Sequence, residues 1–205
     1  MANFKLTNIT PISEEDFFKF LTNRKDILDG VCITGGEPTV NPGLSRFCKK
    51  IKGLGLEVKL DTNGSQPEIL RKLIKNKLID FVAMDVKSIF EEYSKAINAK
   101  CQTSNIKKSI NLILKSGLEY EFRTTVVPGI HDKKILTKLA KQLRSLVVNC
   151  QLPVASYCWV LQQFQPENCL DPKYLKITPF STKKMQDILT SVRKILPKTK
   201  LRSTD

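Results

Sequence analysis

The chain has 205 residues, of which 41% are hydrophobic and 26% are charged, and its 34 basic and 20 acidic side chains give a net charge of +14. This composition excludes a disordered chain, and no apolar run approaches the ~20 residues of a membrane-spanning helix. The first residues lack the apolar stretch of a secretory signal. We therefore expect one cytoplasmic domain over residues 1–205, with a core over about 11–180 and a C-terminal helix and tail over 181–205.

The positive charge is scattered among isoleucines and asparagines along the whole chain, as is typical of solvated helix faces. Only the stretch from Lys183 to Arg202 concentrates it, so specific nucleic-acid binding is not expected. The cysteines form no C-x-x-C pair and are widely spaced, which argues against a zinc ribbon and a disulfide framework. The six are Cys32, Cys48, Cys101, Cys150, Cys158 and Cys169.

Apolar stripes with a helical period alternate with short strand-like runs along the chain. Ser13 is the expected N-cap of the first helix, and Asn41 and Pro42 are the expected cap and first residue of the second. In chain order, the pattern predicts a helix over 13–28, a strand over 30–34, a helix over 41–52, a strand over 56–61, a helix over 66–77, a strand over 79–87, helices over 88–98 and 104–116, a strand over 119–127, a helix over 133–148, a strand over 156–164, a helix over 181–195 and a short last strand in the tail.

Helical crossovers between successive strands are what parallel strands require. The predicted architecture is therefore α/β, either an open doubly wound sheet or a complete or partial barrel. The strands alternate in polarity instead of being apolar throughout. Asp61, Asp85, Lys87 and Arg123 fall on the face opposite the apolar residues. Helices should cover the apolar face, so the charged face lines either a wet barrel interior or one solvated side of a sheet.

Polar turns follow three successive strands, at the edge where α/β folds bind ligands. Gly35 and Gly36 allow close backbone approach and unusual dihedral angles, and Glu37 then presents an anion. The second turn runs from Asp61 to Gly64, and Asp85 and Lys87 end the third strand. One such turn is weak evidence, but three in succession offer both signs of charge to an amino-acid-like zwitterion.

The segments "ITGGEPT", "LDTNGS" and "AMDVK", in this order and spacing, resemble the radical SAM superfamily. The segments "EFRTTVVPGIHD" and "VLQQFQPENCLDP" bring the likeness closest to the activating proteins of anaerobic ribonucleoside-triphosphate reductase and pyruvate formate-lyase. The resemblance covers nearly the whole chain. It implies a partial (β/α)6 TIM-like barrel, S-adenosylmethionine (SAM) at the strand ends, and a glycyl-radical enzyme as partner.

The resemblance also implies roles for individual residues. Glu37 would lie near the SAM ammonium, and Asp61 with Asp85 could hold a small cation. The residues expected to bind the cofactor are Gly35, Gly36, Glu37, Thr62, Asn63, Asp85, Lys87, Arg123 and, near the adenine, Gln163. No role follows for His131.

The chain departs from the family in one large respect. A 4Fe–4S cluster is held there by C-x3-C-x2-C in the loop after the first strand, and neither that strand nor that loop is present here. We expect a chain whose N-terminus is lost and which is inactive in radical generation, because no set of cysteines can hold the cluster. The alternatives are a non-catalytic SAM- or partner-binding module and an RNA-directed relative.

Overall fold

A computed structural model describes residues 10–152, 158–169 and 171–202 of the chain. Six parallel strands form one sheet in the order of the sequence, β1-β2-β3-β4-β5-β6. They are β1 (Gly30–Ile33), β2 (Glu57–Thr62), β3 (Phe81–Asp85), β4 (Glu119–Val126), β5 (Trp159–Gln163) and β6 (Lys200–Arg202). This open sheet alternates with helices and confirms the predicted fold class. That the chain lacks the first strand and the cluster loop of the family stays a prediction.

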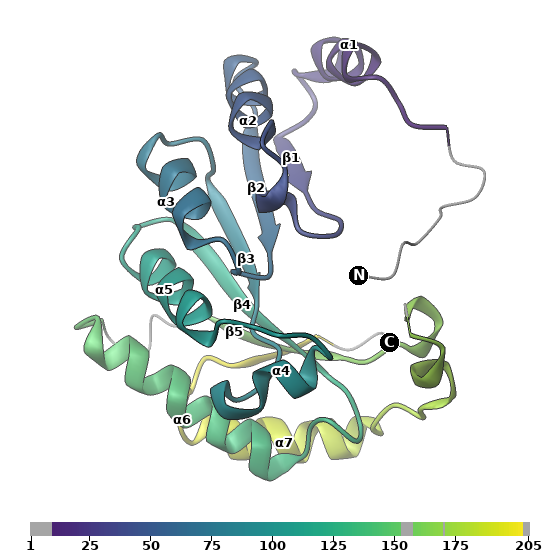
Figure 1. Cartoon of the computed structure of the whole chain (residues 1–205), viewed down its shortest axis with the longest axis vertical. Coiled ribbons are helices and arrows are strands. Elements are labelled where there is room, and N and C mark those ends of the chain that lie inside the picture. The colour runs from purple at the N-terminus through teal and green to yellow at the C-terminus, as the bar shows by residue number, and fades with distance from the viewer. Residues whose placement is uncertain (1–9, 153–157, 170, 203–205) are drawn as a thin grey trace.

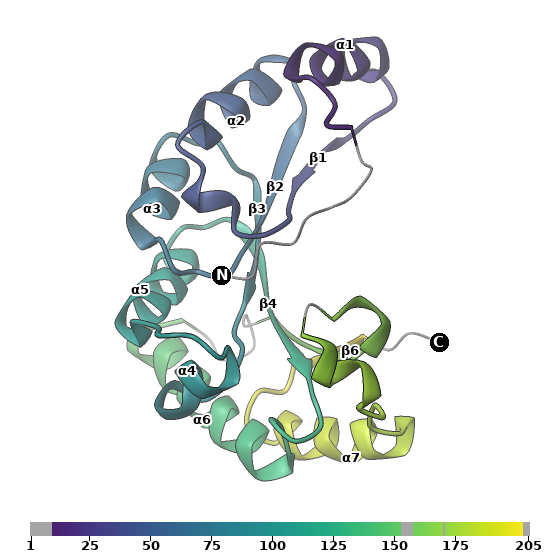
Figure 2. The ribbon, with the colours of Figure 1, turned by 45° about the vertical axis from the view of Figure 1, so that its right-hand side comes forward.

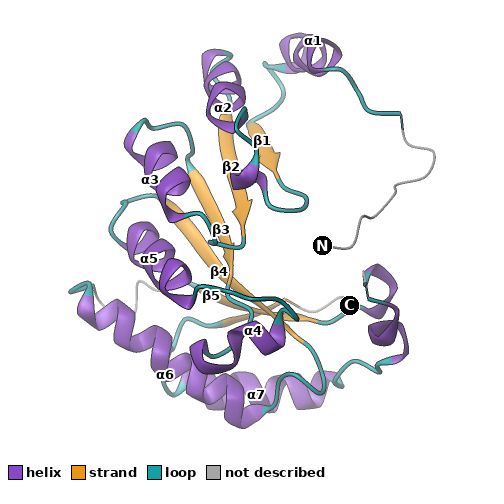
Figure 3. Cartoon of the chain, viewed as in Figure 1, coloured by secondary structure: helices purple, strands orange, loops and turns teal. Residues whose placement is uncertain are grey.

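Helices cover the convex side of the curved sheet and leave its concave side open, as Figures 1 and 2 show from two directions. Figure 3 separates this outer helical layer from the strands inside it. The helices are α1 (Glu14–Arg24), α2 (Leu44–Gly53), α3 (Pro67–Lys75), α4 (Tyr93–Ala96), α5 (Thr103–Leu114), α6 (Lys133–Asn149) and α7 (Thr182–Arg193). None of the helices in the described part of the chain is long and apolar enough to cross a membrane.

One hydrophobic core lies between the sheet and the helices. The strands alternate as predicted. In β2 the apolar Val58 and Leu60 are fully buried against the helices, whereas Lys59 and Asp61 between them are only partly buried. The strand side chains that belong to this core are Val58, Leu60, Val82, Met84, Phe122, Val126, Trp159 and Leu161. At about 25 cal/mol per Å² of apolar surface removed from water, this layer dominates the stability of the fold.

The first helix begins where its cap was predicted. The Ser13 hydroxyl accepts a hydrogen bond from the Asp16 N–H at 3.0 Å, and three acidic residues occupy the first turn, where they favour the helix dipole. This helix packs on α2 through stacked rings, with Phe17 and Phe47 centroids 5.3 Å apart.

Two local predictions were wrong. The second helix starts at Leu44 and not at Pro42, because the side-chain Oδ1 of Asn41 accepts from the Gly43 N–H at 2.8 Å and makes a turn of its own. The helix predicted over 88–98 is two short pieces, a 3₁₀ turn (Phe90–Glu92) followed by α4. The first residues of the strand predicted over 156–164 lie outside the described residues, and β5 begins at Trp159.

Candidate functional site

The Gly35-Gly36-Glu37 loop leaves the carboxyl end of β1 at the open side of the sheet. Gly35 and Gly36 have φ of +93° and +54°, in the left-handed region that other residues rarely adopt. A Cβ atom at either position would meet nothing within 4 Å. The two glycines are therefore required by the path of the backbone, and the space beside them is free.

Glu37 does not point freely into the open space, because protein donors surround its carboxylate. Oε1 accepts from Thr62 Oγ1 at 2.7 Å, from Thr39 N at 3.2 Å and from the Thr39 hydroxyl, and Oε2 accepts from Asn63 N at 2.6 Å. Four donors from two segments thus converge on one carboxylate. Glu37 fastens the loop after β1 to the turn after β2, a contact that the sequence alone did not indicate.

The remaining polar groups of the turn after β2 form hydrogen bonds within the turn. The Thr62 hydroxyl also accepts from Gly64 N at 3.1 Å, and the Asn63 side-chain oxygen accepts from Ser65 N at 2.9 Å. Thr62 is 5% exposed and faces the helical layer, as Met84 opposite it does. Thr62 and Asn63 therefore shape the site by holding Glu37 and the turn.

An ion network occupies the concave face of the sheet. The Arg123 guanidinium lies between two carboxylates, with Nη1 3.0 Å from Asp61 and Nε 3.0 Å from Asp85. These two carboxylates raise the pKa of Arg123 despite the opposing effect of its burial. The position between Asp61 and Asp85 that the sequence assigned to a small cation is filled by this side chain.

Two lysines complete the network. Lys87 Nζ lies 2.7 Å from Asp85, and Lys59 Nζ lies 3.8 Å from Asp61. With Arg123, three cations face two carboxylates, a formal charge of +1. About two fifths of each lysine side chain is exposed, 39% for Lys87 and 38% for Lys59. The concave face therefore offers both signs of charge to a zwitterion, with a small excess of positive charge for its carboxylate.

The strand register separates two neighbouring glutamines. Gln162 pairs with Thr125 and shares the concave face with Arg123, whereas Gln163 pairs with Val126 and faces the helices. Gln163 Nε2 donates to the Phe180 carbonyl at 3.1 Å, on the segment that leads into α7. The structure therefore does not bring Gln163 together with the other predicted residues. It offers Gln162 on the concave face instead.

His131 is a site residue that the sequence left without a role. It is 4% exposed and lies in the loop after β4. Its Nε2 lies 2.8 Å from the Lys87 carbonyl oxygen, which joins this loop to the end of β3. The motif "PGIHD" was visible in the sequence, but no local pattern indicates a bond across 44 positions.

The six cysteines lie at separate places in the described part of the chain. Among the described residues, no group of three or more His, Cys, Asp or Glu side chains could hold a metal ion. Burial and the neighbouring Asp61 raise the pKa of Cys32, and burial raises that of Cys48 to about 11. A metal displaces the proton of a cysteine ligand when it binds, so the fit depends on whether several ligands lie together, and in the described part of the chain they do not. The donor set of these residues does not fit a 4Fe–4S cluster.

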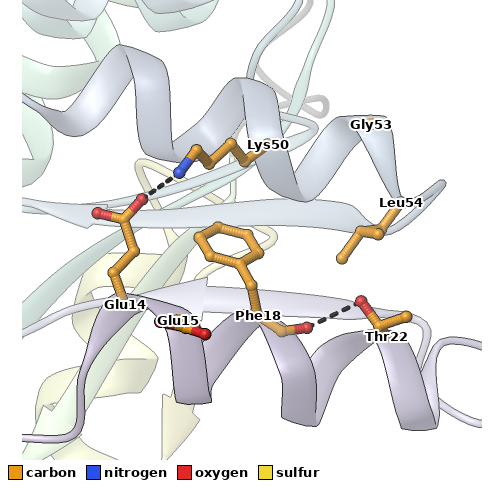
Figure 4. Close-up of a pocket in the computed structure, with 7 residues that line it drawn as sticks. All are labelled: Glu14, Glu15, Phe18, Thr22, Lys50, Gly53 and Leu54. Atoms are coloured by element: carbon orange, nitrogen blue, oxygen red, sulfur yellow. Dashed lines mark hydrogen bonds and ion pairs between the residues drawn. The ribbon is translucent and has the colours of Figure 1, made fainter.

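Another groove lies away from these residues. It has a volume of about 590 Å³ and lies between α1 and α2. Phe18 and Leu54 form its apolar wall, and the Glu14–Lys50 ion pair of 2.6 Å crosses one end, as Figure 4 shows. It contains none of the predicted site residues. A second cavity of about 590 Å³ is lined by Gly35, Glu37 and the start of α2, so the glycine loop borders open space on that side as well.

The fold and the site together define a class of protein. It is an α/β protein with an open parallel sheet, a charged concave face and polar turns at the carboxyl ends of three successive strands. Residues 4–139 match the Radical SAM superfamily. The chain belongs to this superfamily, as the sequence motifs indicate. The superfamily as a whole uses SAM and a 4Fe–4S cluster.

The chain is similar to two proteins of Methanocaldococcus jannaschii that are named as glycyl-radical enzyme activating enzymes. The first is 36% identical over 154 residues, which is 73% of this chain and 60% of the relative. The second is 27% identical over 171 residues, which is 80% of this chain and 64% of the relative. The chain thus spans less than two thirds of either relative.

Among solved structures, a domain of a pyruvate-formate lyase-activating enzyme from Bacteroides vulgatus is similar in fold. Its TM-score is 0.63 at 17% identity, and the match covers 86% of this chain and 99% of that domain. At this identity the likeness concerns the fold.

Proposed function

We propose that this chain is the SAM-binding part of a glycyl-radical enzyme activating protein. The observation that carries the proposal is the meeting of three strand-end segments on one charged concave face. Lys87 and Arg123 provide positive charge for the methionine carboxylate, and Asp61 and Asp85 provide negative charge for its ammonium. The similarity to two activating enzymes over most of this chain supports the choice of reaction class.

In this proposal, the other predicted residues shape the binding site around the methionine part of SAM. The Gly35–Gly36 backbone borders the bound methionine, and no side chain obstructs it. Glu37 holds that loop in place through its hydrogen bonds with Thr62 and Asn63. It therefore favours binding of the SAM ammonium in two ways, by its negative charge and by positioning the loop. In the reaction of the whole activating protein, SAM would supply the radical chemistry, and the substrate would be a glycine in a partner glycyl-radical enzyme.

Because the cysteines do not fit a 4Fe–4S cluster, we further propose that this chain by itself binds SAM without cleaving it. Anaerobic reconstitution with iron and sulfide tests this proposal. We expect no stable iron–sulfur absorption and no release of methionine from SAM. A stable cluster with SAM cleavage would contradict it.

Isothermal titration calorimetry with SAM tests the binding site. Lys87→Met removes a cation from the concave face, and Lys95→Met makes the same change at an exposed position on α4. A hydrogen bond to a charged group contributes about 1.5–3 kcal/mol, so we expect SAM affinity to fall roughly 10-fold to 100-fold in Lys87→Met and to stay unchanged in the control. Equal affinities in the two variants would refute this site.

A second candidate function is a non-catalytic module that binds SAM or docks to the partner enzyme. It is favoured by the positions of the cysteines, because the described residues contain no group of three or more ligands that could hold a metal ion. A pull-down with anaerobic ribonucleotide reductase or pyruvate formate-lyase, with and without SAM, separates partner docking from SAM binding alone. Salt-sensitive RNA binding would instead support an RNA-directed relative.

A further inference from the structure

The segment Asp85-Val86-Lys87 carries two charged side chains of the site just where β3 ends. Strand pairing to β4 reaches Asp85, and the Val86 N–H donates to the Arg123 carbonyl at 2.8 Å. Beyond that bond the segment leaves the sheet. Its next backbone groups therefore need other partners, because a buried N–H or C=O without one costs about 1–3 kcal/mol.

Buried side chains provide those partners. The Lys87 N–H donates to Tyr93 Oη at 3.1 Å, and the Tyr93 hydroxyl donates to the Asp85 carbonyl at 3.3 Å. The Thr124 hydroxyl donates to the Val86 carbonyl at 2.6 Å. Tyr93 and Thr124 are 2% and 0% exposed, so water does not compete for these bonds.

His131 makes the last of these contacts. The Val127 N–H donates to Nδ1 at 3.0 Å, so Nδ1 is the unprotonated nitrogen and Nε2 carries the proton. Nε2 then donates to the Lys87 carbonyl at 2.8 Å. Desolvation lowers the pKa of His131, which keeps the ring neutral and this arrangement of donor and acceptor intact at neutral pH.

Both backbone groups of Lys87 are thus held by buried ring side chains, one from α4 and one from the loop after β4. The Lys87 ammonium itself is on the open side, 39% exposed and 2.7 Å from Asp85. A fixed backbone limits the directions in which a long, flexible lysine side chain points, and less entropy is lost when it binds an anion.

We propose that His131 and Tyr93 are positioning residues that aim the Lys87 ammonium at the carboxylate of the bound ligand. The inference rests on the proposed function, since SAM is the ligand whose carboxylate Lys87 meets. It assigns a role to a histidine and a tyrosine that touch neither the ligand nor any reacting atom.

One test needs no ligand. Tyr93→Phe removes only the hydroxyl, and Tyr174→Phe makes the same change at a tyrosine whose hydroxyl contacts Lys173 and not the Lys87 backbone. We expect amide hydrogen exchange at Lys87 to be about 10-fold faster in Tyr93→Phe, because one hydrogen bond is lost, and unchanged in Tyr174→Phe. Unchanged exchange at Lys87 in Tyr93→Phe would overturn the proposal.

The other test is SAM affinity, measured by calorimetry in two variants of His131. In His131→Gln the amide nitrogen reaches the place of Nε2 and can still donate to Lys87. In His131→Asn the amide oxygen takes the place of Nδ1, so only the bond from Val127 survives. We expect affinity within about threefold of wild type for glutamine and about 10-fold weaker for asparagine. Equal losses, or a greater loss for glutamine, would mean that the ring is only structural.

The two tests separate the inference from the proposed function. If the wild-type chain fails to bind SAM, the proposed function is wrong, and the exchange rates still decide whether the Lys87 backbone is held in this way. Nitrogen NMR of the imidazole gives a third readout without assignment, because His131 is the only histidine of the chain. The Nε2–H tautomer supports the proposal, and the Nδ1–H tautomer overturns it.

Discussion

Replacing Glu37 by glutamine separates two roles for this side chain. The resemblance to the family assigns Glu37 to the ammonium of SAM, whereas the structure surrounds its carboxylate with four donors from Thr39, Thr62 and Asn63. Glutamine keeps the shape but exchanges one oxygen for an NH₂ group. If Glu37 mainly fastens the two turns, the folded chain loses stability even when no ligand is present.

The size of the loss follows from the contacts. If the glutamine oxygen takes the place of Oε1, its NH₂ group meets the Asn63 N–H, which now donates to Oε2 at 2.6 Å. One charge-assisted hydrogen bond is lost and one N–H is left facing another donor, which costs about 2–3 kcal/mol. For a chain of this length that loss lowers the melting temperature by roughly 4–12 °C.

Urea denaturation of the ligand-free chain measures this loss directly. Glu57→Gln is the matched control, since Glu57 is an exposed acid at the other end of β2 with no side-chain bond among the described residues. We expect the control to change the free energy of unfolding by less than about 0.5 kcal/mol. If Glu37→Gln is as stable as the control yet binds SAM more weakly, the fastening role is refuted and the direct ammonium contact stands.

Other substitutions give further expectations. Arg123→Met leaves two partly buried carboxylates without their shared cation and should cost about 2–4 kcal/mol in urea denaturation; a loss below about 0.5 kcal/mol would mean that solvent replaces the guanidinium. Gly64→Ala forces a side chain at φ +73° and makes its Cβ overlap with the buried Met84 Cε, whereas Gly117→Ala has φ +76° and open space around it. We expect Gly64→Ala to cost about 2–4 kcal/mol and Gly117→Ala only about 1–2 kcal/mol, and equal losses would refute the packing argument. Because burial lowers the pKa of His131 from its usual 6.5, the unfolded chain takes up a proton at a higher pH than the folded chain does. The stability that the neutral ring contributes is therefore present above about pH 6.5 and is lost as the pH falls through 6.5 toward the folded-state pKa. Urea titrations of wild type and His131→Gln across this range should show the steeper fall for wild type, and parallel curves would contradict it.

The sequence alone predicted the alternation of parallel strands and helices and the polarity of the two sheet faces. Both follow from local periodicity: side chains alternate along a strand, and helical crossovers join parallel neighbours. Asp61, Asp85 and Arg123 could therefore be assigned to one face before any contact was known, and the structure joins them there. The same periodicity delimits the strands, so the polar turns that follow three of them could also be located from the sequence.

Only the tertiary structure decided what these side chains bond to. Glu37 meets Asn63 across 26 positions, Arg123 bridges Asp61 across 62, and His131 reaches Lys87 across 44. The lengths of the intervening segments do not fix such pairings, because a hydrogen bond depends on where folding brings two atoms to within about 3 Å. The sequence thus determined which charged strand residues face the concave side of the sheet, and the packing of the strand-end loops determined which partners they have.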